Sequence, residues 1–201
     1  MRVGVAAADI TPGIEVRNWV TGRAYAEVLD PLQVQVLTLD DGTAKAALVR
    51  WDLTDVSESS RDEVRRAIEA ATGIPGANVM INASHTHSGP WSPVYKDGYR
   101  GKERDNWWAV RHMPTQNDYP PFRAWMEKLI AATVDATKRA LAGARSSTMS
   151  IGRVSVAEYL YNRRPRAPGW GVADPKSVRA VAASSPDWNA AVLQEIGRAH
   201  V

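Results

Sequence analysis

Residues 32–51, with the sequence LQVQVLTLDDGTAKAALVRW, decide the fold. Residues 32–39 alternate apolar and polar side chains, residues 40–42 are Asp-Asp-Gly, and residues 44–51 are again rich in apolar side chains. A period of two is typical of a strand with one buried face, and Asp-Gly between two such runs is typical of a tight turn. The stretch therefore predicts an antiparallel β-hairpin.

A helix and a further strand are expected after the hairpin. Residues 60–63 (SRDE) match a capping box, apolar residues then recur at helical spacing, and Gly73 ends the run. These features predict a helix over residues 60–72. Residues 77–82 (ANVMIN) predict a short strand. A strand, a helix and a strand in this order predict a crossover between neighbouring strands of one sheet.

Three more elements complete the pattern. Residues 3–10 (VGVAAADI) predict a strand that ends at residues 11–13 (TPG). Residues 122–142 predict a second amphipathic helix, with Gly143 as its stop, and residues 148–161 predict another strand. The order of elements predicts an α/β fold: a mixed sheet with flanking helices, in a single domain.

The composition is typical of a globular protein and excludes several classes. The 201 residues are 44% hydrophobic, and their net charge is +3 with the charges dispersed, so no nucleic-acid partner is indicated. No apolar run approaches the roughly 18 to 20 residues of a membrane span, and no signal peptide is visible, so the sequence as written predicts a cytoplasmic protein without a transmembrane segment. Because the chain has no cysteine, any metal must be bound by nitrogen and oxygen ligands.

Two of the four histidines stand in residues 82–90 (NASHTHSGP), directly after the last strand of the crossover. Loops at strand ends form the ligand crevice of open α/β sheets. His85 and His87 would project to one face if residues 83–87 were extended, and imidazole is a common zinc ligand. A pair of histidines can also simply cap a strand by hydrogen bonds to the backbone, and both interpretations stay open.

Polar and aromatic side chains surround the two histidines. Ser84 and Thr86 are suited to orient the imidazole rings by hydrogen bonds. Residues 91–121 form a long irregular segment rich in Trp and Tyr, beginning with Trp91. Its aromatic side chains can line a pocket for an apolar chain or pack the segment onto the domain. His112, in the same segment, is expected to be structural or exposed to solvent.

Five motifs together resemble the N-terminal catalytic domain of the neutral/alkaline non-lysosomal ceramidase family. In chain order they are VGVAAADITP, DPLQVQVLTLDDG, ALVRWDLT, NASHTHSGP and YNRRPR, and they cover about residues 2–166. The resemblance implies a bacterial zinc-dependent hydrolase that cleaves N-acyl amide bonds, with a small-molecule or lipid amide such as a sphingolipid as substrate. It also implies relatives that are often secreted or periplasmic.

The resemblance implies roles for individual residues. His85 would be a zinc ligand, and His87 would lie beside the metal and act on water or substrate. Asn162 and Arg163 would face the substrate. Trp91 is a candidate substrate contact through its aromatic side chain and not through the resemblance, and it can equally pack its segment onto the domain. Asp52 would support the site from behind the ligands, although an Asp in this position is equally a turn former. Arg163 without the resemblance is half of a solvated basic pair.

The chain departs from the family at two points. Leu29 stands where the family often has a histidine before Asp-Pro-Leu, and the family's other zinc ligands and its serine motif fall beyond the length of this chain. Residues 1–194 are therefore expected to be the N-terminal part of an incomplete catalytic domain. Two alternatives remain: a non-catalytic ligand-binding domain of the same fold, and a metallohydrolase for a different amide or ester. The sequence gives no oligomeric state.

The last residues, 195–201 (EIGRAHV), have neither a helix cap nor a strand pattern that suits the residues before them. Back-translation of residues 196–201 as ATC GGA AGA GCA CAC GTC reproduces a common sequencing adapter. We therefore expect residues 195–201 to be a non-native tail, in a metagenomic fragment, and exclude His200 from any site. A domain cut there should leave strand edges and apolar surface uncovered.

Overall fold

The computed structural model describes residues 1–18, 22–95, 119–155 and 189–196. The chain divides into two compact units, Met1–Ser146 and Ser147–Val201. The first unit contains, in order, β1 (Arg2–Asp9), β2 (Gln33–Asp40), β3 (Lys45–Trp51), α1 (Glu58–Thr72), the single 3₁₀ turn η1 (Gly76–Asn78), β4 (Val79–Ala83), α3 (Pro120–Ala142) and β5 (Arg145–Ser146). The second contains β6 (Thr148–Ser155) and β7 (Asn189–Ile196).

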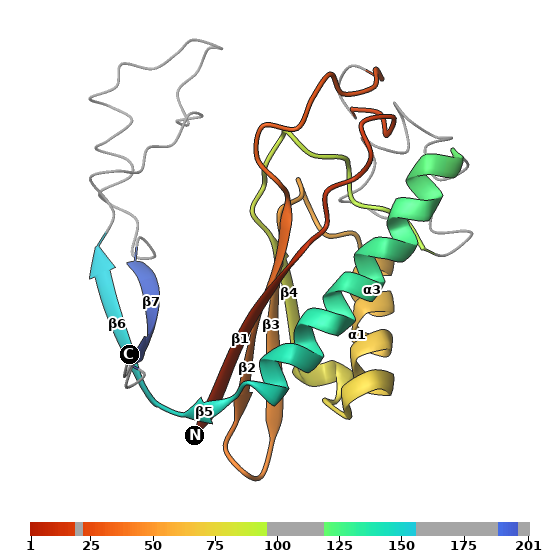
Figure 1. Cartoon of the computed structure of the whole chain (residues 1–201). Coiled ribbons are helices and arrows are strands. Elements are labelled where there is room, and N and C mark those ends of the chain that lie inside the picture. Colours follow the sequence, from red (N-terminus) through yellow and green to blue (C-terminus); the bar gives the residue numbers. More distant parts are fainter. Residues whose placement is uncertain (19–21, 96–118, 156–188, 197–201) are drawn as a thin grey trace, which may run out of the picture. The chain divides into compact units, whose positions relative to one another are not determined.

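The first unit is a five-stranded mixed sheet in the order β4-β3-β2-β1-β5. β2 pairs antiparallel with both β1 and β3, whereas β3 and β4 are parallel and α1 connects them. The hairpin, the crossover and the α/β class are thus confirmed, and the first four strands lie within two residues of their predicted limits. Both helices lie on one face of the sheet (Figure 1), where they cover its buried side chains.

Helix α1 begins two residues earlier than predicted. Its N-cap is Ser57, whose side chain accepts a hydrogen bond from the backbone N–H of Ser60, so the predicted capping box at residues 60–63 is wrong. Several serines precede the helix, and the one whose hydroxyl reaches a free N–H three residues on takes the cap. The predicted end is confirmed: Gly73 adopts φ 71°, a left-handed conformation that glycine enters without strain.

Helix α3 lies against β1 and β2 and is held there by two tryptophans. The indole Nε1 of Trp125 donates to the carbonyl of Ile10 at 2.6 Å, and Nε1 of Trp51 in β3 donates to Thr133 Oγ1 at 2.9 Å. The helix passes so close to Gly4 that a Cβ atom there would lie 1.8 Å from the Ala140 carbonyl oxygen. Among the described residues, no helix is long and apolar enough to cross a membrane.

Helix α3 also begins earlier than its pattern predicts, at Pro120 and not at residue 122. Proline is tolerated in the first helical turn, where the N–H that it lacks would have no helical partner. In the second unit, β6 confirms the predicted strand as far as Ser155, and residues 156–161 lie outside the described residues.

Strand β7 pairs antiparallel with β6, with Ile151 opposite Leu193. It extends to Ile196, into a stretch where the sequence indicated no strand, so that interpretation was wrong. Strand formation here depends on a partner far away in the chain, which local patterning does not reveal.

One cross-strand row of apolar side chains lies on the face of the sheet opposite the helices. Val5 pairs with Leu37, Leu37 with Leu48, and Leu48 with Met80, so the four residues share one face, which we call the outer sheet face. Val5 is 64% exposed and Met80 60% exposed. An exposed apolar row that reaches the edge strand β4 is the kind of surface that associates with other chains.

We expect the chain to self-associate through the outer sheet face, and Met80→Lys to reduce this association because a charge on an edge strand opposes pairing. Sedimentation velocity over a concentration series measures the effect, and circular dichroism checks the fold. Ala70→Lys adds the same charge on the exposed surface of α1 and is the matched control. Equal association of the two variants and the wild type would contradict the prediction.

Candidate functional site

The site is built where two parallel strands end side by side. Trp51, the last residue of β3, pairs with Ala83, the last residue of β4. Ser84 then continues the pairing, because its N–H donates to the Trp51 carbonyl at 2.9 Å. The segment that leads from β3 to α1 and the segment that follows β4 therefore run next to each other, and the two histidines lie in the second.

His85 does not continue the strand. Its φ is 63°, in the left-handed region that residues other than glycine rarely adopt, so residues 83–87 are not extended throughout and the condition for both histidines to share a strand face is not met. Its Nδ1 lies 2.6 Å from the carbonyl oxygen of Thr54. A carbonyl only accepts hydrogen bonds, so Nδ1 carries the proton and Nε2 presents a lone pair. Histidines that bind metals through Nε2 are commonly held in this way.

The two imidazole rings nevertheless meet. Nε2 of His87 lies 3.4 Å from Nε2 of His85, with the rings at 80° and their centroids 4.9 Å apart. Two nitrogen ligands about 2.0 to 2.1 Å from a tetrahedral zinc ion would be about 3.3 Å apart. The pair thus fits two corners of a zinc site. His87 is equally close enough to exchange a proton with a molecule bound at His85 Nε2.

A catalytic zinc ion normally has three protein ligands. Within residues 1–18, 22–95, 119–155 and 189–196, no group of three or more His, Cys, Asp and Glu side chains could hold a metal ion. His85 and His87 are therefore two candidate ligands and not a complete site.

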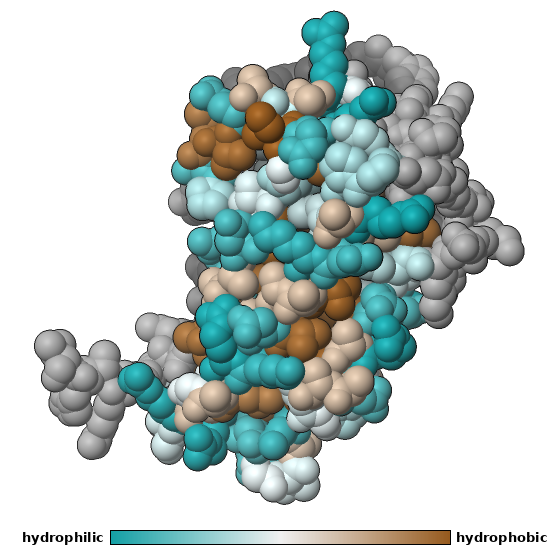
Figure 2. Space-filling model, turned by 45° about the vertical axis from the view of Figure 1, so that its right-hand side comes forward, coloured by the Kyte–Doolittle hydropathy of each residue, from teal (hydrophilic) through white to brown (hydrophobic). Residues whose placement is uncertain are grey.

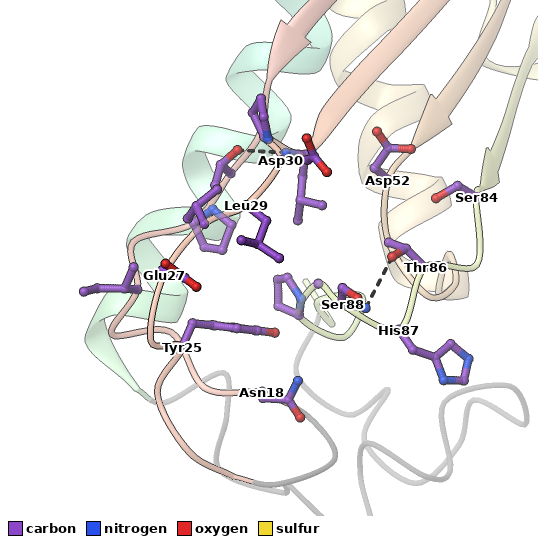
Figure 3. Close-up of a pocket in the computed structure, with 18 of the residues that line it drawn as sticks. Asn18, Tyr25, Glu27, Leu29, Asp30, Asp52, Ser84, Thr86, His87 and Ser88 are labelled. Atoms are coloured by element: carbon purple, nitrogen blue, oxygen red, sulfur yellow. Dashed lines mark hydrogen bonds between the residues drawn. The ribbon is translucent and has the colours of Figure 1, made fainter.

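A cavity of about 770 Å³ opens beside residues 84–93, which contain both histidines and which we call the histidine loop. Its lining comes from the segment between β1 and β2 and from the ends of β3 and β4 (Figure 3). The lining residues are Thr11, Pro12, Gly13, Ile14, Asn18, Tyr25, Glu27, Val28, Leu29, Asp30, Pro31, Leu32, Arg50, Asp52, Ser84, Thr86, His87, Ser88, Gly89 and Pro90. The ring of His87 lies at the edge of the cavity, turned away from Tyr25 and Leu29 (Figure 3).

The cavity has a polar wall at the strand ends and a mixed wall from the segment between β1 and β2, where aliphatic side chains stand beside those of Asn18, Glu27 and Asp30. Ile14, Val28 and Leu29 supply exposed aliphatic side chains from the segment between β1 and β2, and Leu29 is 84% exposed. An apolar area is visible at the top of the molecule (Figure 2), at the end where the cavity loops lie in Figure 1. Asp52 and Ser84 lie together on the opposite wall (Figure 3). The cavity can therefore contact a hydrocarbon group and a polar group of one ligand.

The polar wall is ordered by hydrogen bonds to the strand ends. The carboxylate of Asp52 accepts from the backbone N–H of Gln33 at 3.1 Å and lies 3.3 Å from the guanidinium of Arg50. The hydroxyl of Ser84 is buried and has no hydrogen-bond partner among the described residues. Thr86 accepts from the Ser88 N–H through its own hydroxyl, at 3.3 Å. Asp52 therefore joins two strands, and Ser84 offers an unused donor next to them.

One predicted site residue lies apart from this arrangement, and three more of the residues considered in the sequence fall outside the described ranges. Trp91 is buried and does not line the cavity. Asn162 and Arg163 lie outside the described residues, as does His112.

Sequence patterns missed a buried serine cluster that joins α1 to the histidine loop. The hydroxyls of Ser57 and Ser60 both donate to the Pro93 carbonyl, at 2.8 and 2.6 Å. The hydroxyl of Ser92 accepts from the Ser57 N–H at 3.2 Å. The run of serines before the helix was the available signal, but their partners stand more than 30 residues further along the chain.

Tyr25, also missed, has a perturbed phenol. Burial raises its pKa from the ordinary 10.0 to about 12, against a smaller lowering by the neighbouring Asn18 side chain. Because the folded pKa is the higher one, the contribution of Tyr25 to stability is complete below about pH 10. It is lost as the pH rises through about 12, since the unfolded chain loses the proton first.

We expect Tyr25→Phe to flatten the fall of the free energy of unfolding between about pH 10 and 12, because phenylalanine carries no proton to lose. Urea denaturation at a series of pH values measures this. A residual slope is expected from Tyr95, whose pKa burial also raises. A slope equal to that of the wild type would show that Tyr25 is not buried in the folded state.

Comparisons with known proteins place the fold. No family model matches the chain, and no curated protein matches it. A solved structure described as a ceramidase complexed with C2 matches with a TM-score of 0.57 and 18% identity, over 77% of this chain and 23% of that one. Neutral ceramidase from Pseudomonas aeruginosa matches with a TM-score of 0.56 and 21% identity, over 77% and 24%. The chain thus has a ceramidase-like fold and spans about a quarter of the length of either protein.

Proposed function

We propose that the chain carries part of the site of a zinc-dependent hydrolase that cleaves N-acyl amide bonds, as the likeness to ceramidases implies. The observation that supports this most is the arrangement of the two histidines. The contact of His85 Nδ1 with the Thr54 carbonyl favours the tautomer in which Nε2 carries the lone pair, and Nε2 of His87 lies 3.4 Å away. Two histidines that only capped a strand would not be expected to bring their Nε2 atoms this close together.

Each histidine has a distinct part in the proposed reaction. Zinc, when bound, polarises the amide carbonyl and makes water more acidic. His85 would hold the metal through Nε2. His87, at the edge of the cavity, would either be a second ligand of the metal or carry a proton between water and the departing amine.

The cavity supports an amphiphilic substrate. The aliphatic side chains of Ile14, Val28 and Leu29 would contact the acyl chain, while the polar groups at Asp52 and Ser84 would face the amide or the head group. Ser84, with a buried hydroxyl that lacks a partner among the described residues, is the best placed of these to donate to an oxygen of the substrate. Asn162 and Arg163 are proposed as substrate contacts on the resemblance alone, whereas Trp91, which is buried and does not line the cavity, is not proposed as one.

A second candidate is a ligand-binding domain that has no metal. The cavity favours it, because its lining includes His87 but not His85, and its two walls could hold an amphiphile without help from the histidine pair. Metal binding separates the two candidates.

We expect His85→Ala to abolish Zn²⁺ binding measured by isothermal titration calorimetry, because the proposed Nε2 ligand is lost. The variant His87→Ala distinguishes the two proposed roles of His87. Zn²⁺ affinity should fall if His87 is a metal ligand and persist if it only carries a proton. Glu69→Ala removes another side chain that could bind a metal, on the exposed surface of α1, and serves as the control. Zinc affinity that His85→Ala leaves unchanged would refute the metal centre and favour the binding domain.

We expect Leu29→Asp to weaken the binding of a long-chain N-acyl amide about tenfold or more, since a buried leucine contributes about 1.5 to 3 kcal/mol. Binding of a short-chain amide should hardly change. Because Leu29 is exposed in the free protein, the fold should tolerate the substitution. Calorimetry below the critical micelle concentration measures both ligands, and Ile151→Asp, at another exposed aliphatic residue, is the matched control. Equal losses for both ligands would exclude Leu29 from the acyl-chain wall.

A further inference from the structure

Thr54 makes two hydrogen bonds to the histidine loop. Its backbone carbonyl accepts from Nδ1 of His85 at 2.6 Å, and its hydroxyl donates to the carbonyl of Thr86 at 2.9 Å. The first bond holds the ring of His85. The second holds the peptide group between Thr86 and His87. One residue thus contacts both the ring of His85 and the backbone of the residue that follows it.

His85 needs such a restraint. With φ at 63° it occupies a conformation that is unfavourable for a residue with a Cβ atom, and such residues persist only where their surroundings hold them. If the hold on the Thr86 carbonyl were lost, the backbone at His85 could relax toward negative φ. The ring would then swing away from the Thr54 carbonyl, and its tautomer would no longer be determined by that contact.

Thr54 itself is well anchored. Its side chain is buried, and Leu53 before it is part of the hydrophobic core. Three residues on, the N-cap Ser57 joins the same segment to Pro93 beyond the histidines. The segment from β3 to α1 is therefore bound to the core before Thr54 and to the histidine loop after it. Thr54 is held in place from both sides.

We infer that Thr54 is the positioning residue of this site: its hydroxyl holds His85 in the left-handed conformation in which Nδ1 is protonated and Nε2 faces His87. Thr54 does not touch the ligand and acts only through His85. The part of this inference that concerns metal affinity rests on the proposed zinc function. The part that concerns the conformation and tautomer of His85 does not.

The test compares Thr54→Val, which keeps the shape and loses the hydroxyl, with Thr54→Ser, which keeps the hydroxyl. Thr38→Val is the matched control, because Thr38 is also buried and its hydroxyl also donates to a backbone carbonyl, that of Gly4, far from the histidines. Nitrogen-15 NMR of the imidazole rings at about pH 9, where imidazole is neutral, reports the tautomer without any metal. Zn²⁺ titration calorimetry reports the affinity.

We expect the wild type, Thr54→Ser and Thr38→Val to keep the proton of His85 on Nδ1, and Thr54→Val to show a mixture of both tautomers. Thr54→Val should also bind Zn²⁺ about 10- to 100-fold more weakly, the usual effect of removing a group that orients a ligand. A wild type with the proton on Nε2 overturns the inference even if no variant folds. So does a Thr54→Val protein with the tautomer of the wild type. A wild type that binds no zinc refutes the proposed function, and the tautomers still decide the role of Thr54.

Discussion

The parallel pairing of β3 with β4 is the constraint on which the rest of the site depends. It sets Trp51 opposite Ala83, so the segments that leave the two strands start side by side, at the same end of the sheet. Parallel strands need a crossover, and α1 supplies it on the buried face. Thr54 and His85 are 31 residues apart in sequence, and it is this register that brings them into contact.

The core transmits this constraint to the cavity. Trp51 is fully buried at the end of β3, and its indole N–H is satisfied by Thr133 of α3, so the strand end is fixed by packing and by a hydrogen bond at once. On the other side, Asp52 ties the first residue after β3 to Gln33 at the start of β2. The polar side chains Asp52 and Ser84 are thus fixed at the strand ends. The aliphatic side chains on the opposite side of the cavity belong to the long segment between β1 and β2.

Much of this architecture could be predicted because its signals are local. The alternation in β2, the Asp-Gly turn and the glycine after α1 each depend on neighbouring residues, and each was confirmed. The N-cap of α1 could not be chosen among Ser57, Ser59 and Ser60 without knowing which N–H each hydroxyl reaches. Strand β7 was missed because its reason for being extended is a partner strand about 40 residues away.

The candidate site divides in the same way. Chain order alone places His85 and His87 after a strand, in the loop where a ligand is expected, because the position of a loop follows from the elements around it. The left-handed turn at His85, the approach of the two Nε2 atoms, the contacts of Thr54 and the burial of Tyr25 came only from the folded structure. They depend on hydrogen bonds and burial between segments distant in sequence, and no periodicity along the chain encodes which carbonyl an imidazole will meet.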